Sequence, residues 1–300
     1  MSEFFEQLDA LRRVEGRAAL ATLVDTRGST PRKEGAKMWV GEDGRILGSV
    51  TIGGCVDAQV MAEAEGVLSA AAPRLLALDL GDEDAWEIGL TCGGTIEVFV
   101  EPVVLGESRD GALPFYETLR AHLAAGRGGA LVTRLDAPHA GAKLLVLDDG
   151  RREGTLGDAA LDAAAASAAA EGFASGASRT VRLGPGAAVR CFVELHMPAP
   201  TLLVVGAGHV AMPLCALAKT LGFHTIVVDG RPRLATRERF PDADELLVGI
   251  PSELARRTPM LPSTAVVLVA HDYKYDLPVL RHALQTPAGY VGMLGSRRRG

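Results

Sequence analysis

Two cysteines of this chain stand beside glycine pairs, in mirrored order. The first motif reads Gly53-Gly54-Cys55 and the second reads Cys92-Gly93-Gly94, with the two cysteines 37 positions apart. Glycine pairs let the backbone take positive φ angles and let a bulky or anionic group approach the main chain closely. A thiol at such a turn can serve as a nucleophile, a sulfur carrier or a soft metal ligand. Two ordinary core cysteines are the alternative interpretation.

A second group of candidate site residues follows a strand expected at 18–26. The Gly, Ser and Pro of segment 27–37 predict an exposed loop. Cations, hydroxyls and backbone N–H groups in such a loop can converge on a phosphate. The residues expected to contact an anion are Arg27, Ser29, Thr30, Arg32 and Lys37. A solvated loop without a ligand is the alternative.

The third group belongs to a dinucleotide-fold fingerprint. The segment Gly206-Ala207-Gly208-His209-Val210-Ala211 lies between an apolar strand at 201–205 and a helix that runs to Leu221. Gly206 would make the tight turn and Gly208 would let a pyrophosphate approach the helix. Asp229, at the end of the next strand, is placed to bind a ribose hydroxyl. The pattern predicts a Rossmann fold; His209, where a small residue is usual, leaves a bound NAD(P) or other nucleotide open.

His271 and Asp272 complete the candidate residues. They follow a strand expected at 265–270, at the carboxyl edge where doubly wound sheets bind ligands. A further strand is expected at 290–294. A pair that only caps the next helix is the alternative for His271 and Asp272.

These patterns predict an α/β protein with two domains. Residues 1–197 should form a mixed α+β domain that carries both cysteine motifs, and residues 198–300 a Rossmann-like, doubly wound parallel sheet. Strict alternation at 95–102 predicts a half-buried strand. The alanine-rich segment 157–171 predicts a helix with Asp158 as N-cap and Gly172 as C-cap. We expect no internal repeat. The remaining predicted elements are helices at 2–13, 56–72 and 114–124, and strands at 37–40, 46–51, 75–80, 129–133, 142–147, 189–195 and 223–228, with 196–200 as linker.

The composition excludes some classes of partner. The net charge of −6 argues against nucleic-acid and membrane-surface binding, because both need a basic face. No segment resembles a signal peptide or a transmembrane helix, and the chain has only four cysteines. We therefore expect a cytoplasmic protein without structural disulfides, in which Cys191 and Cys215 only pack.

Several stretches resemble one known family, the XdhC/CoxI accessory proteins of xanthine dehydrogenase and related molybdenum hydroxylases. They include GSVTIGGCVDAQV, GLTCGGTIEVFVEP and a long segment that starts LLVVGAGHVAMPLC. The matching ranges are 21–40, 48–60, 89–102, 202–244, 271–280 and 289–299. The resemblance implies a chaperone that is not itself an enzyme. Such a protein binds molybdenum cofactor (Moco), assists its sulfuration with a cysteine desulfurase, and inserts it into the apo-hydroxylase.

On this resemblance, Cys55 or Cys92 would ligate molybdenum while the glycine turns and the 27–37 loop hold the pterin phosphate. A homodimer is also expected. The chain departs from the family at Asp57, where glutamate is commoner. It also ends at Gly300, where members usually continue with another helix and strand, so the resemblance implies a shortened chain with an incomplete last sheet.

Two other functions remain open from the sequence. The Rossmann fingerprint would suit a nicotinamide-dependent oxidoreductase, with His209 or His271 as proton donor, and tight NAD(H) binding would favour it. Cys55 and Cys92 would suit a thiol-redox or sulfur-transfer enzyme, which a persulfide or a disulfide that turns over would favour. Among molybdenum hydroxylases, xanthine dehydrogenase, carbon monoxide dehydrogenase and aldehyde oxidases are all candidate clients.

Overall fold

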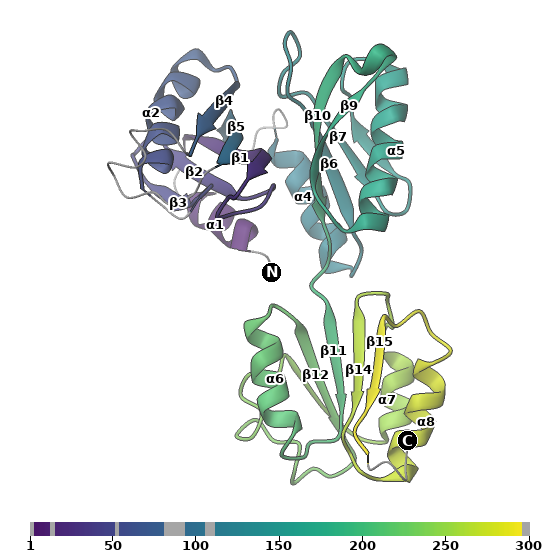
Figure 1. Ribbon diagram of the computed structural model, residues 1–300. Helices are drawn as coiled ribbons and strands as arrows, with labels where there is room; N and C mark the ends of the chain where they lie inside the picture. Colours follow the sequence, from purple (N-terminus) through teal and green to yellow (C-terminus); the bar gives the residue numbers. More distant parts are fainter. Residues whose placement is uncertain (1–2, 13–15, 52–53, 81–93, 106–111, 296–300) are drawn as a thin grey trace. The chain divides into compact units, whose positions relative to one another are not determined.

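The computed structural model of the protein describes residues 3–12, 16–51, 54–80, 94–105 and 112–295 (Figure 1). The chain divides into two compact units, Met1–Pro198 and Ala199–Gly300. Antiparallel sheets with helices form the first unit and a parallel sheet forms the second, so the predicted fold class is confirmed. No helix among the described residues is both long and apolar enough to cross a membrane.

The first half of the first unit is an antiparallel sheet with the strand order β3-β2-β1-β5-β4. Its elements are α1 (Glu3–Arg12), β1 (Arg17–Gly28), β2 (Lys37–Gly41), β3 (Ile46–Gly48), α2 (Cys55–Ala70), β4 (Arg74–Asp79) and β5 (Gly94–Val104). Apolar residues recur along α2 at helical spacing, and Val60, Ala64 and Val67 are fully buried against the sheet. The sheet therefore has one face covered by α2, which follows directly from the first cysteine motif.

The second half repeats this arrangement, with the strand order β8-β7-β6-β10-β9. Its elements are α4 (Leu113–Ala124), β6 (Gly129–Arg134), β7 (Lys143–Leu147), β8 (Arg152–Gly154), α5 (Ala159–Ser175), β9 (Arg179–Leu183), a short 3₁₀ turn (Pro185–Ala187) and β10 (Val189–His196). Within the described residues, each half thus runs as a helix, three strands, a second helix and two strands. The expectation of no internal repeat was wrong.

The repeat is also visible in the sequence once the strands are aligned. Gly35-Ala36-Lys37 with Asp43-Gly44-Arg45 recurs at the same spacing as Gly141-Ala142-Lys143 with Asp149-Gly150-Arg151. Lys37 pairs across the strands with Thr22, as Lys143 does with Thr133. Glu101 pairs with Leu20, as Glu194 does with Leu131. Lys37, Thr22 and Glu101 therefore correspond to Lys143, Thr133 and Glu194.

The two halves exchange ion pairs. Lys37 Nζ lies 3.0 Å from Glu194 of the other half, and Lys143 Nζ lies 2.8 Å from Glu101. Phe99 and its counterpart Phe192 pack in one buried cluster between the sheets. Phe99 and Glu101 are accordingly 2% and 7% exposed, so β5 is buried on both faces along its middle. The prediction of a half-buried strand failed because the second sheet covers the other face.

The ends of two elements, β1 and α5, also differ from expectation. β1 continues to Gly28, because Arg27 and Gly28 stay paired with the start of β5. Helix α5 has Asp158 as N-cap, as predicted, but runs on to Ser175 with Gly176 as C-cap. Gly172 lies inside this helix, where a Cβ would come within 3.1 Å of the Leu195 side chain.

The second unit is a parallel sheet with the order β13-β12-β11-β14-β15 (Figure 1). The sequence predicted β11, β12, β14, β15 and α6, but not β13, α7 or α8. Its elements are β11 (Thr201–Val205), α6 (Ala211–Thr220), β12 (His224–Asp229), β13 (Glu245–Val248), α7 (Pro251–Arg257), β14 (Thr264–Leu268), α8 (Tyr273–Ala283) and β15 (Tyr290–Met293). One face of the sheet packs on α6 and the other on α7 and α8.

Candidate functional site

Both cysteine motifs and the basic loop are attached at one edge of the first sheet. At this edge β1 ends, β2 begins and β3 ends, because Met38 at the start of β2 pairs with Gly48. Here β4 also ends, and β5 begins at Gly94. The basic loop joins β1 to β2, the turn with Cys55 follows β3, and the segment with Cys92 joins β4 to β5. The basic loop and both cysteine motifs, which span 68 positions from Arg27 to Gly94, are therefore attached to strand ends at a single edge of the sheet.

The second cysteine motif ends at Gly94, where two backbones touch. Gly94 pairs with Gly28, and a Cβ on Gly94 would lie 2.5 Å from the Arg27 carbonyl oxygen and 2.9 Å from that of Ser29. No larger residue fits there without displacing the main chain. Cys92 and Gly93 lie outside the described residues, but their chain enters β5 directly beside the basic loop.

The first cysteine motif starts a helix. Gly54 is the N-cap of α2 with a φ of 92°, a conformation that favours glycine, and Cys55 is the first helical residue. Asp57 in the first turn accepts hydrogen bonds from Ser49 and Thr51, which ties the helix start to the end of β3. Gly53 and the Cys55 side chain lie outside what the structure describes. A thiol at a helix N-terminus generally ionises more easily.

The second half provides an internal comparison for these loops. Lys37 follows Thr22 by 15 positions, whereas Lys143 follows Thr133 by 10. Ile96 follows its strand partner Leu78 by 18 positions, whereas the corresponding pair, Leu183 and Val189, is 6 apart. The added length holds the basic loop in the first case and Cys92 in the second. The basic loop and the segment with Cys92 are therefore additions of the first half to a frame that both halves share.

The residues expected to bind an anion differ in their exposure and in their contacts. The Arg27 side chain is 79% exposed and lies 3.4 Å from Asp25. Ser29 is exposed, and Thr30 donates a hydrogen bond to the Arg32 carbonyl. Arg32 is half-buried, and its guanidinium has no ion pair among the described residues.

Lys37 corrects the expectation of an available cation. Its side chain is 6% exposed and is committed to Glu194, with a further hydrogen bond of 2.9 Å to Thr22 Oγ1. Burial lowers the pKa of Lys37, against the effect of the Glu194 carboxylate. Burial also opposes the ionisation of Glu194, but the charges of Lys37 and His196 outweigh it and lower the pKa of Glu194 to about 2.

This ion pair lines a cleft of about 280 Å³, which we call the β10 cleft. The ring of Phe4 on α1 forms one side, and its polar lining residues are Gln7, Arg32, Glu34, Lys37, Ser178, Glu194 and His196. His196, assigned to a linker from the sequence, is the last residue of β10. Its Nε2 atom lies 2.9 Å from Glu194 Oε1 but is buried without a hydrogen bond. Sequence patterns missed this cleft because its walls come from both halves.

The second unit gathers the other candidate residues at its carboxyl edge. Gly206 has a φ of 108°, and a Cβ there would lie 2.4 Å from the backbone of Ala270. Asp229 is 2% exposed and accepts hydrogen bonds from the Ala207 N–H and from three nitrogens of Arg231. Burial opposes its ionisation, but these bonds prevail and lower the pKa of Asp229. Its oxygens are thus occupied, contrary to the role expected at a ribose hydroxyl. Gly208 is half-buried and His209 is exposed in the turn before α6.

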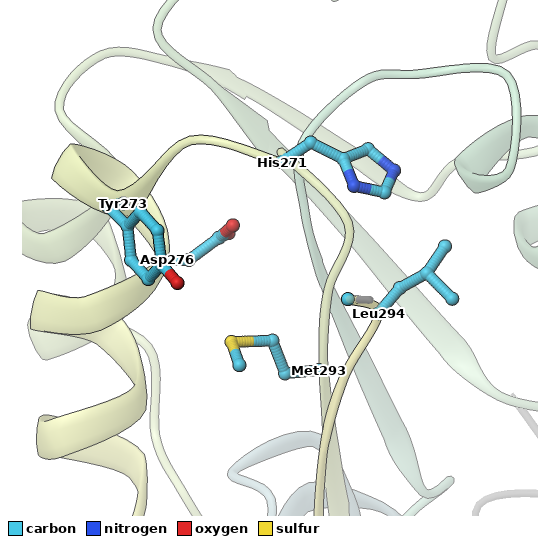
Figure 2. A pocket seen from close by; sticks show the side chains of 6 residues that line it. His271, Tyr273, Asp276, Met293 and Leu294 are labelled. Carbon is cyan, nitrogen blue, oxygen red and sulfur yellow. The ribbon is translucent and has the colours of Figure 1, made fainter. Parts of the chain in front are cut away.

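Beside this turn, Asp272 caps α8 by accepting from the Lys274 N–H, and His271 has a φ of 57°. Figure 2 shows the Asp276 side chain pointing from α8 into a small cavity next to His271 and Met293. The cavity measures about 10 Å³, enough for one water molecule. Asp276 Oδ1 is buried without a hydrogen bond, and burial raises the pKa of Asp276.

Among the described residues, no group of three or more His, Cys, Asp or Glu side chains could hold a metal ion. Cys191 and Cys215 are buried, and burial raises the pKa of Cys191 to about 11. They behave as packing residues, as expected.

Comparison with known proteins identifies the family. The sequence model of the XdhC and CoxI family matches residues 11–79 and 122–184, and that of the XdhC Rossmann domain matches residues 202–300. The chain belongs to the XdhC and CoxI family. The first two matched segments fall one in each half of the first unit.

Relatives of this XdhC/CoxI-family chain carry two kinds of name. A Bacillus subtilis (strain 168) protein named as a probable xanthine dehydrogenase subunit is 30% identical over 301 residues, covering 100% of this chain and 86% of the relative. The molybdenum cofactor insertion chaperone PaoD of Escherichia coli (strain K12) is 27% identical, covering 94% of this chain and 68% of its own length. A crystal structure described as a xanthine dehydrogenase from Bacillus halodurans matches with a TM-score of 0.77 and 29% identity, over 100% of this chain and 83% of that one.

Proposed function

We propose that this chain is an accessory protein that binds molybdenum cofactor and assists its sulfuration and insertion into a molybdenum hydroxylase such as xanthine dehydrogenase. The observation that carries the proposal is the single sheet edge to which both cysteine motifs and the basic loop are attached. Family membership and the name of PaoD support the same function. The second half has shorter connections in place of the basic loop and the segment with Cys92, which indicates that the shared frame does not need the added length to fold.

The residue types fit this cargo. Molybdenum in the cofactor is held by two sulfurs, and thiolates of Cys55 and Cys92 are soft ligands suited to such a metal. The glycines of both turns allow close approach of the cofactor, and Arg27 and Arg32 offer positive charge for its phosphate. We assign no catalytic residue to this chain.

The proposed partners are the apo-hydroxylase, a cysteine desulfurase and a second copy of the chain. The desulfurase would supply the sulfur for the cofactor, and the hydroxylase would receive the finished product. Co-purification of each tagged partner with this chain, with and without Moco synthesis in the host, tests these assignments. The proposal requires that the hydroxylase be retained when it lacks cofactor and released once it is loaded.

The decisive experiment measures molybdenum and pterin after purification from a host that makes Moco. We expect near-stoichiometric cofactor in the wild type and at least about a tenfold loss in Cys55→Ala or Cys92→Ala. Cys215→Ala, which removes a buried packing thiol, is the matched control and should keep the cofactor. A wild-type protein free of molybdenum and pterin would overturn the proposal.

A further inference from the structure

Because the first unit is duplicated, residues of the β10 cleft have equivalent positions in the other half. Several polar residues of the cleft have an apolar residue at the equivalent position. His196 pairs with Gly129 at the end of β10, and the corresponding residue of β5 is Val103, which pairs with Ala18. In the loops before Lys37 and Lys143, Glu34 corresponds to Ala140. The α1 residue next to Gly48 is Gln7, whereas the α4 residue next to Gly154 is Phe115.

The comparison of the halves distinguishes residues that the fold requires from residues that a ligand would use. The Lys–Glu pairs occur on both sides, so they belong to the packing of the two halves. Gln7, Glu34 and His196 have apolar counterparts in the same frame. Glu34 accepts a hydrogen bond from Thr26 within the fold, whereas His196 Nε2 is buried without a hydrogen bond. Burying such a group at a site that an apolar residue can fill costs free energy, and a ligand that binds His196 offsets this cost.

The cleft offers three different contacts. The Glu194 carboxylate is ionised and, with about four lone-pair positions, can accept more hydrogen bonds than Lys37 supplies. The ring of Phe4 lies in an aromatic group with Trp39 and Tyr116 and lines the cleft. Arg32 brings from the basic loop a guanidinium that forms no ion pair within the described part of the chain. A buried carboxylate, an aromatic face and a cation suit a flat nitrogen heterocycle that carries a phosphate.

We propose that the β10 cleft binds the pterin end of the cofactor, with Glu194 accepting from the N–H groups of its pyrimidinone ring and Arg32 binding its phosphate. This inference rests on the proposed function. The pyrimidinone of molybdopterin lies at one end, and the dithiolene and phosphate lie at the other. Arg32 belongs to the basic loop, so the phosphate-bearing end would lie towards the sheet edge where that loop is attached. The cleft volume of about 280 Å³ is near the lower limit of about 300 Å³ for small-molecule sites, which suits one fused ring system.

The test uses the full chain and a pterin without metal. Neopterin monophosphate and neopterin are titrated in turn, and binding is followed by pterin fluorescence. We expect neopterin monophosphate to bind more tightly than neopterin. Arg32→Gln should lower the affinity for neopterin monophosphate by about tenfold or more and leave the affinity for neopterin unchanged. Lys33→Gln is the matched control, because Lys33 is exposed in the same loop but does not line the cleft.

A second variant probes the ring contacts. His196→Val introduces the residue found at the corresponding position of β5, so the fold should be retained, and circular dichroism and thermal unfolding check this. We expect His196→Val to lower the affinities for neopterin and for neopterin monophosphate by similar factors. Failure of the wild type to bind neopterin monophosphate, or equal effects of Arg32→Gln and Lys33→Gln, would overturn the inference. If the wild type still purified with Moco in that case, the proposed function would stand and only the place of the pterin would be wrong.

Discussion

The buried Lys37–Glu194 pair is a structural contact that also shapes a ligand site. Both side chains are 6% exposed, and each would be costly to bury alone. Tyr116 lies 3.3 Å from Lys37 Nζ, and burial together with Glu194 and Glu101 raises the pKa of Tyr116 well above its usual value. The lysine therefore holds Glu194 in its ionised form at neutral pH, which is the form that accepts hydrogen bonds.

This coupling makes the free energy of unfolding depend on pH. The folded pKa of Glu194, about 2, is below the unfolded value of about 4.3, so its contribution is fully present above pH 5 and is lost as the pH falls towards 2. We expect Glu194→Gln to destabilise the protein by about 3–5 kcal/mol at pH 7, since Lys37 stays buried without its partner. The difference from wild type should shrink between pH 5 and pH 3.

Urea unfolding followed by circular dichroism at pH 7, 5 and 3 measures this difference. Glu65→Gln, on the exposed side of α2, removes a carboxylate from the same unit and should change stability by no more than about 0.5 kcal/mol. A Glu194→Gln deficit that stays constant from pH 7 to pH 3 would contradict the assignment of a depressed pKa to this group.

At the scale of elements, two glycines hold equivalent places in the halves. Gly48 and Gly154 have φ angles of 78° and 86°, and a Cβ on either would lie 2.5 or 2.4 Å from the carbonyl oxygen of Lys37 or Lys143. We expect Gly48→Ala and Gly154→Ala each to destabilise the protein by about 1–3 kcal/mol, because both the backbone strain and the close carbonyl are the same.

The comparison is made by thermal or urea unfolding, with Gly66→Ala as the control. Gly66 lies inside α2, where alanine is favoured over glycine by about 0.5–1 kcal/mol, so this variant should be slightly more stable. If only one of the two strand-end variants lost stability, the halves would not be equivalent at this position.

Local patterns in the sequence predicted most elements but not what lies opposite them. Alternation at 95–102 located β5, yet it could not reveal that a second sheet covers Phe99 and Glu101. Residue types alone locate the cysteine motifs and the basic loop. They also predict that Lys37 is an available cation for an anion. Its partner Glu194 is distant in sequence and belongs to the other half. Pairings of that range arise from tertiary packing, which periodicity does not encode.

At the scale of the molecule, duplication explains how the first unit can carry a ligand site without loss of its frame. The halves contact each other through corresponding residues, as two copies do in an isologous interface. The second half keeps short connections, while the first half carries the long loops. The second half therefore packs against the first half and forms part of the wall of the β10 cleft.

Such packing requires the two halves to unfold together. Leu131 of β6 shares a buried cluster with Trp39 of β2, and both tryptophans of the chain precede the second half. We expect Leu131→Ala to lower the stability reported by tryptophan fluorescence by about 2–5 kcal/mol, although the substitution lies in the half without tryptophan. Ser167→Ala, exposed on α5 of the same half, should leave the fluorescence transition in place. A circular-dichroism transition shifted by Leu131→Ala without a matching shift in fluorescence would mean that the halves unfold separately. The second half would then be a neighbour of the ligand site and not part of the wall that holds it.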